Sequence, residues 1–372
     1  MQHQTPRSEL FRTFGRIGLL SFGGPAAQIS LMHQSLVEDK GWLKEKDFLG
    51  ALSFCMLLPG PEAMQLATFC GWKLRGTIGG LIAGLLFFLP GALVIFSLVA
   101  VYAAFGDTPL ISAAFLGVKA AVVAIVLQAL MRLGAKMLTT WPNRLVAMAS
   151  LVALYTGLLP FPAVMALAAI VGLAFGATSE PTPSLAPSHP NIAHTGRTIL
   201  IWGALWLIPI AVLFTLDAPF LQDVALFFSR LAVVTFGGAY AVLTYMVQTV
   251  VQDFGWLTTD QMMDALGLAE TTPGPLILVT QFVATLAGTQ FGGLGLGIAA
   301  GLTALWCTFT PLFFMDFCRR PACRSYSCGP KIKRCTDLYF RGCCRRHRQP
   351  WHLVHDQFGF CGNSPNTGRS AS

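Results

Sequence analysis

Apolar residues run through this chain in stretches about as long as a bilayer is thick. A spanning helix needs about 20 consecutive apolar residues, because the bilayer core holds no water to bond the backbone of other structures. Four stretches predict spanning helices: 77–104, 111–131, 199–216 and 291–314. A fifth, 145–175, carries "GLLPFP" at 157–162, so two short helices meeting at a bend and one long tilted helix both fit it.

The pattern is also repeated. A shift of 214 residues aligns 14–62 with 228–276 without a gap, and 18 of the 49 positions are identical. The shared landmarks are Phe-Gly-Gly at 22–24 and 236–238, Gly-Trp-Leu at 41–43 and 255–257, and Pro-Gly-Pro at 59–61 and 273–275. The chain therefore contains an internal duplication.

The duplication predicts the domain organisation. The first repeat is expected at 1–176, a Pro-, Ser- and Thr-rich linker at 177–197, a second and shorter repeat at 198–316, and a tail without apolar runs at 317–372. By the 214-residue shift, about three spans of the second repeat are missing after 316.

Composition agrees with a membrane protein. Hydrophobic residues make up 54% of the chain and charged residues 11%, whereas about a quarter of the residues in a soluble domain are charged. The net charge of +8 belongs to the tail, because residues 316–372 hold 11 Lys and Arg against 3 Asp and Glu. No nucleic-acid partner is expected.

Basic residues indicate how the repeats are inserted. Lys73 and Arg75 precede the 77–104 span and Arg132, Lys136 and Arg144 follow the 111–131 span, which predicts a hairpin with both ends cytoplasmic. The segment aligned with "GWKLRG" (71–76) reads "TLAGTQ" (285–290) and has no basic residue. We therefore expect an all-α polytopic protein with two homologous halves in an inverted repeat, a recurrent plan of secondary transporters.

The Pro-Gly-Pro triplets predict helices broken within the membrane. Proline removes a donor and ends one helix, and it suits the first turn of the next. The free N–H groups at the start of the new helix attract anions, so two related breaks could serve one shared anion. Alternatively, each triplet is the turn of a hairpin at the surface, and Phe-Gly-Gly is a site of close helix packing.

Ionisable residues near apolar segments are candidates for the anion path. Arg16 and Arg230 occupy equivalent positions before the two Phe-Gly-Gly motifs and are expected to neutralise the anion, or else to reach the membrane interface. Lys73 and Arg75 are candidates for a cytoplasmic patch that receives the anion, or else they only mark topology.

Two further ionisable residues are candidates for coupling. Lys119 lies in "FLGVKAAVVAIV" (115–126), where it would line an ion path or pair with a carboxylate. Glu62 follows the first triplet, where it would couple binding to protonation or stabilise the start of a helix.

Together, "FGGPAAQI", "GWL", "LLPGPEAMQLATFCGWKLRG", "FFLPG" (87–91), "FGGAYA" and "TTPGP" resemble the chromate ion transporter family in its long, two-domain form, over residues 8–316. The resemblance implies a multi-pass carrier of the inner (plasma) membrane that exports chromate and confers resistance, with sulfate as an alternative anion. The residues that match the duplicated family motifs are Gly23, Gly24, Pro59, Gly60, Pro61, Gly237, Gly238, Pro273, Gly274 and Pro275.

Other chemistries lack support in the sequence. No phosphate-binding loop, Cys-x-x-Cys pair or His-Glu-x-x-His motif occurs, so we expect no enzyme activity, no metal site and no cofactor. The expected partners are chromate or sulfate, the lipid bilayer and a second copy of the chain in a homodimer.

The tail holds seven of the ten cysteines and departs from the family pattern. A frame change near codon 316 would produce it and could leave an inactive membrane protein or a partner subunit. A metal-binding tail and a basic tail on the anionic leaflet are the alternatives.

Overall fold

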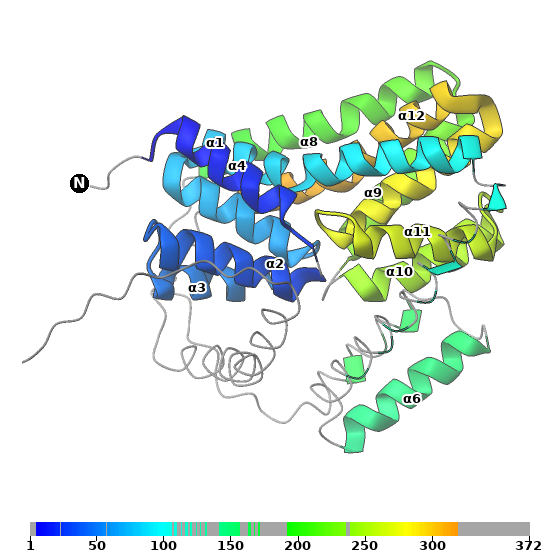
Figure 1. Cartoon of the computed structure of the whole chain (residues 1–372), viewed down its shortest axis with the longest axis horizontal. Coiled ribbons are helices and arrows are strands. Elements are labelled where there is room, and N and C mark those ends of the chain that lie inside the picture. The colour runs from blue at the N-terminus through cyan, green and yellow to red at the C-terminus, as the bar shows by residue number, and fades with distance from the viewer. Residues whose placement is uncertain are drawn as a thin grey trace, which may run out of the picture. The chain divides into compact units, whose positions relative to one another are not determined.

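The protein is helical throughout its described part. A computed structural model describes residues 5–22, 24–56, 58–105, 141–156, 192–235 and 239–318, with scattered residues between 108 and 171. Every regular element in these ranges is a helix (Figure 1). Three helical stretches among them are long and apolar enough to cross a membrane: Glu62–Phe105, Gly196–Thr215 and Leu276–Phe317. The prediction of an all-α membrane protein is confirmed at this level.

Two series of helices have the same order. The first is α1 (Arg7–Leu19), α2 (Gly24–His33), the π-helical turn η1 (Gln34–Asp39), α3 (Glu45–Cys55) and α4 (Glu62–Phe105). The second is α9 (Pro219–Val234), α10 (Ala239–Gln248), the π-helical turn η2 (Thr249–Asp253), α11 (Thr259–Thr271), the 3-10 turn η3 (Leu276–Leu278) and α12 (Val279–Cys318). Because π-helical turns are rare, their repetition at matched positions extends the sequence duplication to the backbone.

Each long helix is broken at the same place. In α4, Gly76 has φ 66° and ψ −153°, and in α12, Gly293 has φ 77° and ψ −177°. Only glycine adopts these angles at little cost. These glycines are 217 residues apart rather than 214, and the three residues of η3 account for the difference. Segment 71–76 therefore matches 288–293, "GTQFGG", which still has no basic residue.

The predicted spans agree with these helices in different degrees. The part of α4 after its break coincides with the predicted span 77–104, and α12 contains the predicted span 291–314, which begins at its break. The predicted span 199–216 lies almost wholly in α8 (Ile192–Thr215), and this helix begins within the predicted linker. Part of 145–175 forms α6 (Trp141–Tyr155). Most of 111–131 and all of 157–162 lie outside the described residues.

Shorter helices pack along the two long ones. Figure 1 shows α1 beside α4, and contacts also join α9 to α12 and α4 to α12. The buried face of α1 carries Leu10, Phe14 and Ile17 at helical spacing. Gly18 lies on the same face, one turn after Phe14, and a Cβ atom added to it would overlap the carbonyl oxygen of Leu86. The absence of a side chain at Gly18 therefore sets how closely α1 approaches α4.

This close approach predicts different outcomes for two glycines of one helix. Gly18→Ala should lower the free energy of unfolding by about 1–3 kcal/mol, because the added methyl group forces α1 away from α4. Gly15→Ala is the matched control, since nothing lies within 4 Å of its added Cβ. Thermal unfolding of the purified protein in detergent would measure both, and equal midpoints would contradict the packing described.

Candidate functional site

Each Pro-Gly-Pro triplet lies in a buried, non-helical segment between two helices. Residues 59–61 join α3 to α4, and residues 273–275 join α11 to η3. Gly60 has φ 122° and Gly274 has φ 99°, a region that other residues rarely adopt. The triplet therefore places a glycine amide, which neither helix uses, in the interior of the protein.

The two glycine amides bond to the opposite series of helices. The N–H of Gly60 donates to the carbonyl oxygen of Thr235 at 2.7 Å, and the N–H of Gly274 donates to the carbonyl oxygen of Ser21 at 2.9 Å. Ser21 and Thr235 occupy matched positions, each directly before a Phe-Gly-Gly motif. We call these four residues the glycine clasp. Each series thus supplies the donor at one bond and the acceptor at the other.

Close packing supports the clasp from both long helices. A Cβ atom on Gly60 would overlap the side chain of Leu312 in α12. On the other side, a Cβ atom on Gly91 would overlap the carbonyl oxygen of Pro273, and the position of a Cβ on Gly274 lies 3.7 Å from the carbonyl oxygen of Phe87. The "FFLPG" motif at 87–91 therefore packs directly against the second triplet.

Two buried glutamines of the first series donate to backbone carbonyl oxygens at the clasp and at the first triplet. The Nε2 atom of Gln28 donates to the carbonyl oxygens of Gly274 at 2.7 Å and of Ser21 at 3.3 Å. The Nε2 atom of Gln65 donates to the carbonyl oxygen of Pro59 at 2.8 Å. The matched positions of the second series are apolar, valine at 242 and phenylalanine at 282. The site is therefore not fully symmetric.

Neither glutamine was predicted from the sequence, because the candidate residues came from the Gly and Pro motifs and from ionisable side chains. A usable signal was present, since each amide stands alone four residues after a motif, Gln28 after Gly24 and Gln65 after Pro61. A lone amide in an apolar segment needs a partner, and the carbonyls freed by a helix break are the nearest ones.

The structure brings some predicted site residues together and leaves others apart. Both triplets lie at the clasp, and Gly24 begins α2 with φ 80°. Gly23, Gly237 and Gly238 lie outside the described residues. The side chains of Arg16 and Arg230 are exposed, and no hydrogen bond or ion pair joins them to the described part of the chain. Their role as anion partners stays a prediction.

Three of the remaining predicted residues, Glu62, Lys73 and Arg75, lie at the start of α4 or near its break. Lys73 forms an ion pair with Asp47 at 3.0 Å, and the Nε atom of Arg75 donates to the carbonyl oxygen of Thr5 at 2.7 Å. Glu62 is the first residue of α4, where a carboxylate interacts favourably with the helix dipole. Lys119 lies outside the described residues.

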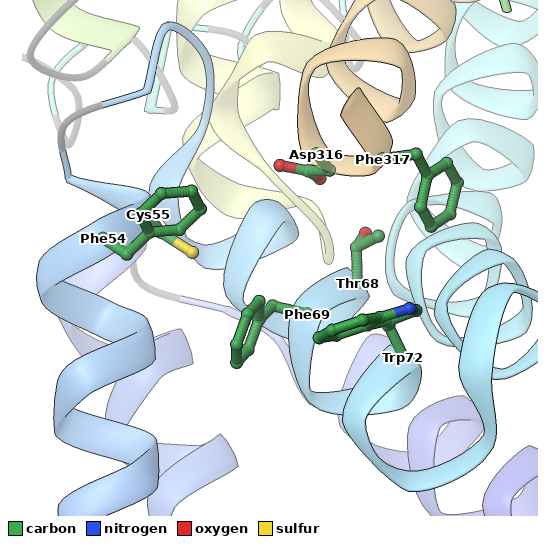
Figure 2. Close-up of a pocket in the computed structure, with 7 residues that line it drawn as sticks. All are labelled: Phe54, Cys55, Thr68, Phe69, Trp72, Asp316 and Phe317. Carbon is green, nitrogen blue, oxygen red and sulfur yellow. The ribbon is translucent and has the colours of Figure 1, made fainter. Parts of the chain in front are cut away.

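A small pocket lies between α3, α4 and α12. Aromatic rings form most of its wall. Figure 2 shows its lining residues, which are Phe54 and Cys55 from α3, Thr68, Phe69 and Trp72 from α4, and Asp316 and Phe317 from α12. A carboxylate lines this pocket and no cationic side chain does, so it is poorly suited to a dianion. No group of three potential metal ligands occurs in the part of the chain that the structure describes.

These features define an all-helical membrane protein whose two similar series of helices meet at paired backbone breaks. Comparison with known proteins identifies the family. The chromate transporter family model matches residues 8–173 and 222–337, more than half of the chain. The chain therefore belongs to the chromate transporter family, whose members are transporters. The second match extends 21 residues into the tail predicted at 317–372.

Related proteins cover most of the chain. It is 33% identical to a chromate transport protein of Pseudomonas aeruginosa over 82% of this chain and 72% of the relative. It is 29% identical to a probable chromate transport protein of Synechococcus elongatus over 87% and 78%, and 28% identical to a chromate transport protein of Cupriavidus metallidurans over 88% and 78%. No solved structure matches the chain.

The contacts of Gln28 predict a stability effect. Gln28→Leu should lower the free energy of unfolding by about 1–3 kcal/mol, because the carbonyl oxygen of Gly274 loses a buried donor. Gln34→Leu is the matched control, since Gln34 is exposed in the following turn. Thermal unfolding in detergent would compare the two variants, and an unchanged midpoint for Gln28→Leu would contradict the bond.

Proposed function

We propose that this protein is a secondary transporter that exports chromate across the plasma membrane and so confers resistance to chromate. The family match and the names of the relatives support chromate as the transported anion. The reciprocity of the glycine clasp carries the mechanistic part of the proposal, because it joins two similar helix series through backbone groups at their breaks. Secondary transporters commonly place their site at such a junction.

The proposal includes opposite orientations of the two series in the membrane. Lys73 and Arg75 lie at the break of α4, whereas the matched positions of α12 are Gln290 and Gly292. Cytoplasmic loops are enriched in Lys and Arg, so this difference supports an inverted repeat. Within it, each triplet would interrupt a pair of helices at membrane depth, which is tolerated where the backbone is buried in protein.

The anion would bind where the clasp opens. A tetrahedral dianion needs N–H donors, and the amides of Gly60 and Gly274 are bonded to carbonyls in this structure. Chromate would take these donors only in a state in which the two series have moved apart. When no anion is bound, the carbonyl oxygens of Ser21 and Thr235 would accept from the same amides that bind the anion. When these bonds form again, chromate would be released. Phe-Gly-Gly backbone at 22–24 and 236–238 would add further donors.

Charged residues would act outside the clasp. Arg16 and Arg230 are proposed to neutralise the anion as it passes, and Lys73 and Arg75 to attract it at the cytoplasmic side. Glu62 and Lys119 remain proposed coupling residues. We also propose that the protein forms a homodimer in the inner membrane.

Uptake of labelled chromate into everted membrane vesicles tests this function. The full chain should accumulate chromate above an empty-vector control, and excess sulfate should compete because it has the same shape and charge. Gly60→Ala and Gly274→Ala should each reduce uptake at least about tenfold, since strain at positive φ adds to lost donor geometry. Gly15→Ala should transport like the wild type.

Two controls make the result decisive. The amount of each variant in the membrane and its unfolding midpoint are measured, so that lost transport is separated from lost protein. Absence of chromate uptake by the wild-type chain, with the protein present in the membrane, would contradict the proposed function. Uptake of sulfate without chromate would instead identify a sulfate transporter.

A further inference from the structure

The ring of Phe313, in α12, fills a notch in the first series of helices. A Cβ atom added to Gly84 in α4 would lie 2.6 Å from the Cε1 atom of Phe313 and 2.6 Å from the Oγ1 atom of Thr68. Thr68 precedes the break of α4 and Gly84 follows it, and both residues are buried. The ring therefore occupies space that only a glycine at 84 leaves open. We call Gly84 and Thr68 the first notch.

A second notch has the same residues in the other series. A Cβ atom added to Gly301 in α12 would lie 2.7 Å from the Cε1 atom of Phe96 in α4, and it would overlap the hydroxyl group of Thr285. Each of these residues lies 217 positions from its counterpart at the first notch, the shift that also relates the breaks of the two long helices. We call Gly301 and Thr285 the second notch. Each series thus supplies one notch and the ring that fills the other.

The two notches lie at opposite ends of one contact between α4 and α12. Three pairs mark this contact in order along α4: Gly84 with Phe313, the stacked rings of Phe88 and Phe309, and Phe96 with Gly301. Residue numbers rise along α4 while they fall along α12, so these parts of the helices run in opposite directions. Gly84 and Phe96 are 12 residues apart, which is about 18 Å of helix.

Both Pro-Gly-Pro triplets pack within the stretch between the notches. Pro273 lies against Gly91, which is between Gly84 and Phe96 in α4. On α12, Gly60 lies against Leu312, which is just inside the end marked by Phe313. The glycine clasp is therefore flanked along these helices by one filled notch at each end.

Each notch lies near the break of its own helix. Gly84 is eight residues after Gly76, and Gly301 is eight residues after Gly293. In the orientation proposed above, the break of α4 faces the cytoplasm because it carries basic residues. The first notch then lies on the cytoplasmic side of the clasp, and the second notch lies on the opposite side.

Close packing of helices accounts for either contact taken alone, because small residues let membrane helices approach one another. It does not require that each series place a ring in the other, or that the two rings stand on opposite sides of the clasp. Apolar constrictions of this kind exclude hydrated ions. The pairing therefore suits a path that must be closed on each side in turn.

We propose that Phe313 and Phe96 are the two gates of the anion path, Phe313 closing the cytoplasmic side of the clasp and Phe96 the opposite side. When the series separate at one end, one ring leaves its notch and opens the clasp to that side, while the other ring stays in place. Weakening a gate therefore favours the state that is open to its own side. This inference rests on the proposed function.

Exchange of labelled external chromate against chromate loaded inside vesicles tests each gate from both sides. Everted vesicles present the cytoplasmic face to the label, and right-side-out vesicles present the other face. Phe313→Leu should lower the KM for chromate about three- to tenfold in everted vesicles and raise it in right-side-out vesicles, since apparent affinity follows the fraction of molecules open to the label. Phe96→Leu should produce the opposite pair of changes.

The direction of the KM change, rather than the amount of transport, identifies a gate. The ring of Phe313 also contacts the ring of Trp202 in α8, with centroids 5.9 Å apart, so Phe313→Leu costs stability as well. Lost stability removes active protein from both vesicle types alike and does not reverse the KM between them. Phe105→Leu is the matched control, because this ring of α4 is 57% exposed, and its KM should equal that of the wild type in both vesicle types.

Two glycine variants repeat the test if the leucine variants do not fold. Gly84→Ala and Gly301→Ala place a methyl group where the ring lies, so each should push its ring out of the notch and change the KM in the same direction as loss of that ring. KM values that shift alike in both vesicle types, or that stay at the wild-type values, would overturn the gates. A wild-type chain that exchanges no chromate would contradict the proposed function, on which the gates rest.

Discussion

The rest of this structure depends on an exchange of backbone hydrogen bonds between two broken helix pairs. Each Pro-Gly-Pro triplet frees a glycine amide, and the carbonyl oxygens of Ser21 and Thr235, directly before the two Phe-Gly-Gly motifs, accept from these amides. Buried backbone groups must be bonded, and no water serves them in a bilayer core. Because each series satisfies the break of the other, neither can reach this arrangement alone.

The same interaction relates the fold to transport. A bond between a backbone amide and a carbonyl can be exchanged for a bond to an oxyanion at modest net cost, since both acceptors present oxygen. The proposed mechanism uses this equivalence, with the clasp closed when no anion is bound.

Sequence patterns predicted much of the fold but only part of the site. Apolar length and the repeat located the long helices and both triplets, because these depend on local composition. The pairing of Gly60 with Thr235 could not be predicted, since it depends on how distant segments cross. The three extra residues of η3 also ended the ungapped alignment, which hid the match between Gly76 and Gly293. The exposure of Arg16 and Arg230 likewise depends on which helix face packs inward.

Hydrogen–deuterium exchange followed by mass spectrometry tests the clasp most directly. The exchanging protons of the clasp are the amides of Gly60 and Gly274, whose acceptors lie in the opposite series. Gly18→Ala displaces the end of α1 that leads to Ser21, so it should increase exchange of the amide of Gly274 in the opposite series. Gly15→Ala should leave this amide protected. Unchanged exchange at Gly274 in Gly18→Ala would contradict the clasp and the account of transport built on it.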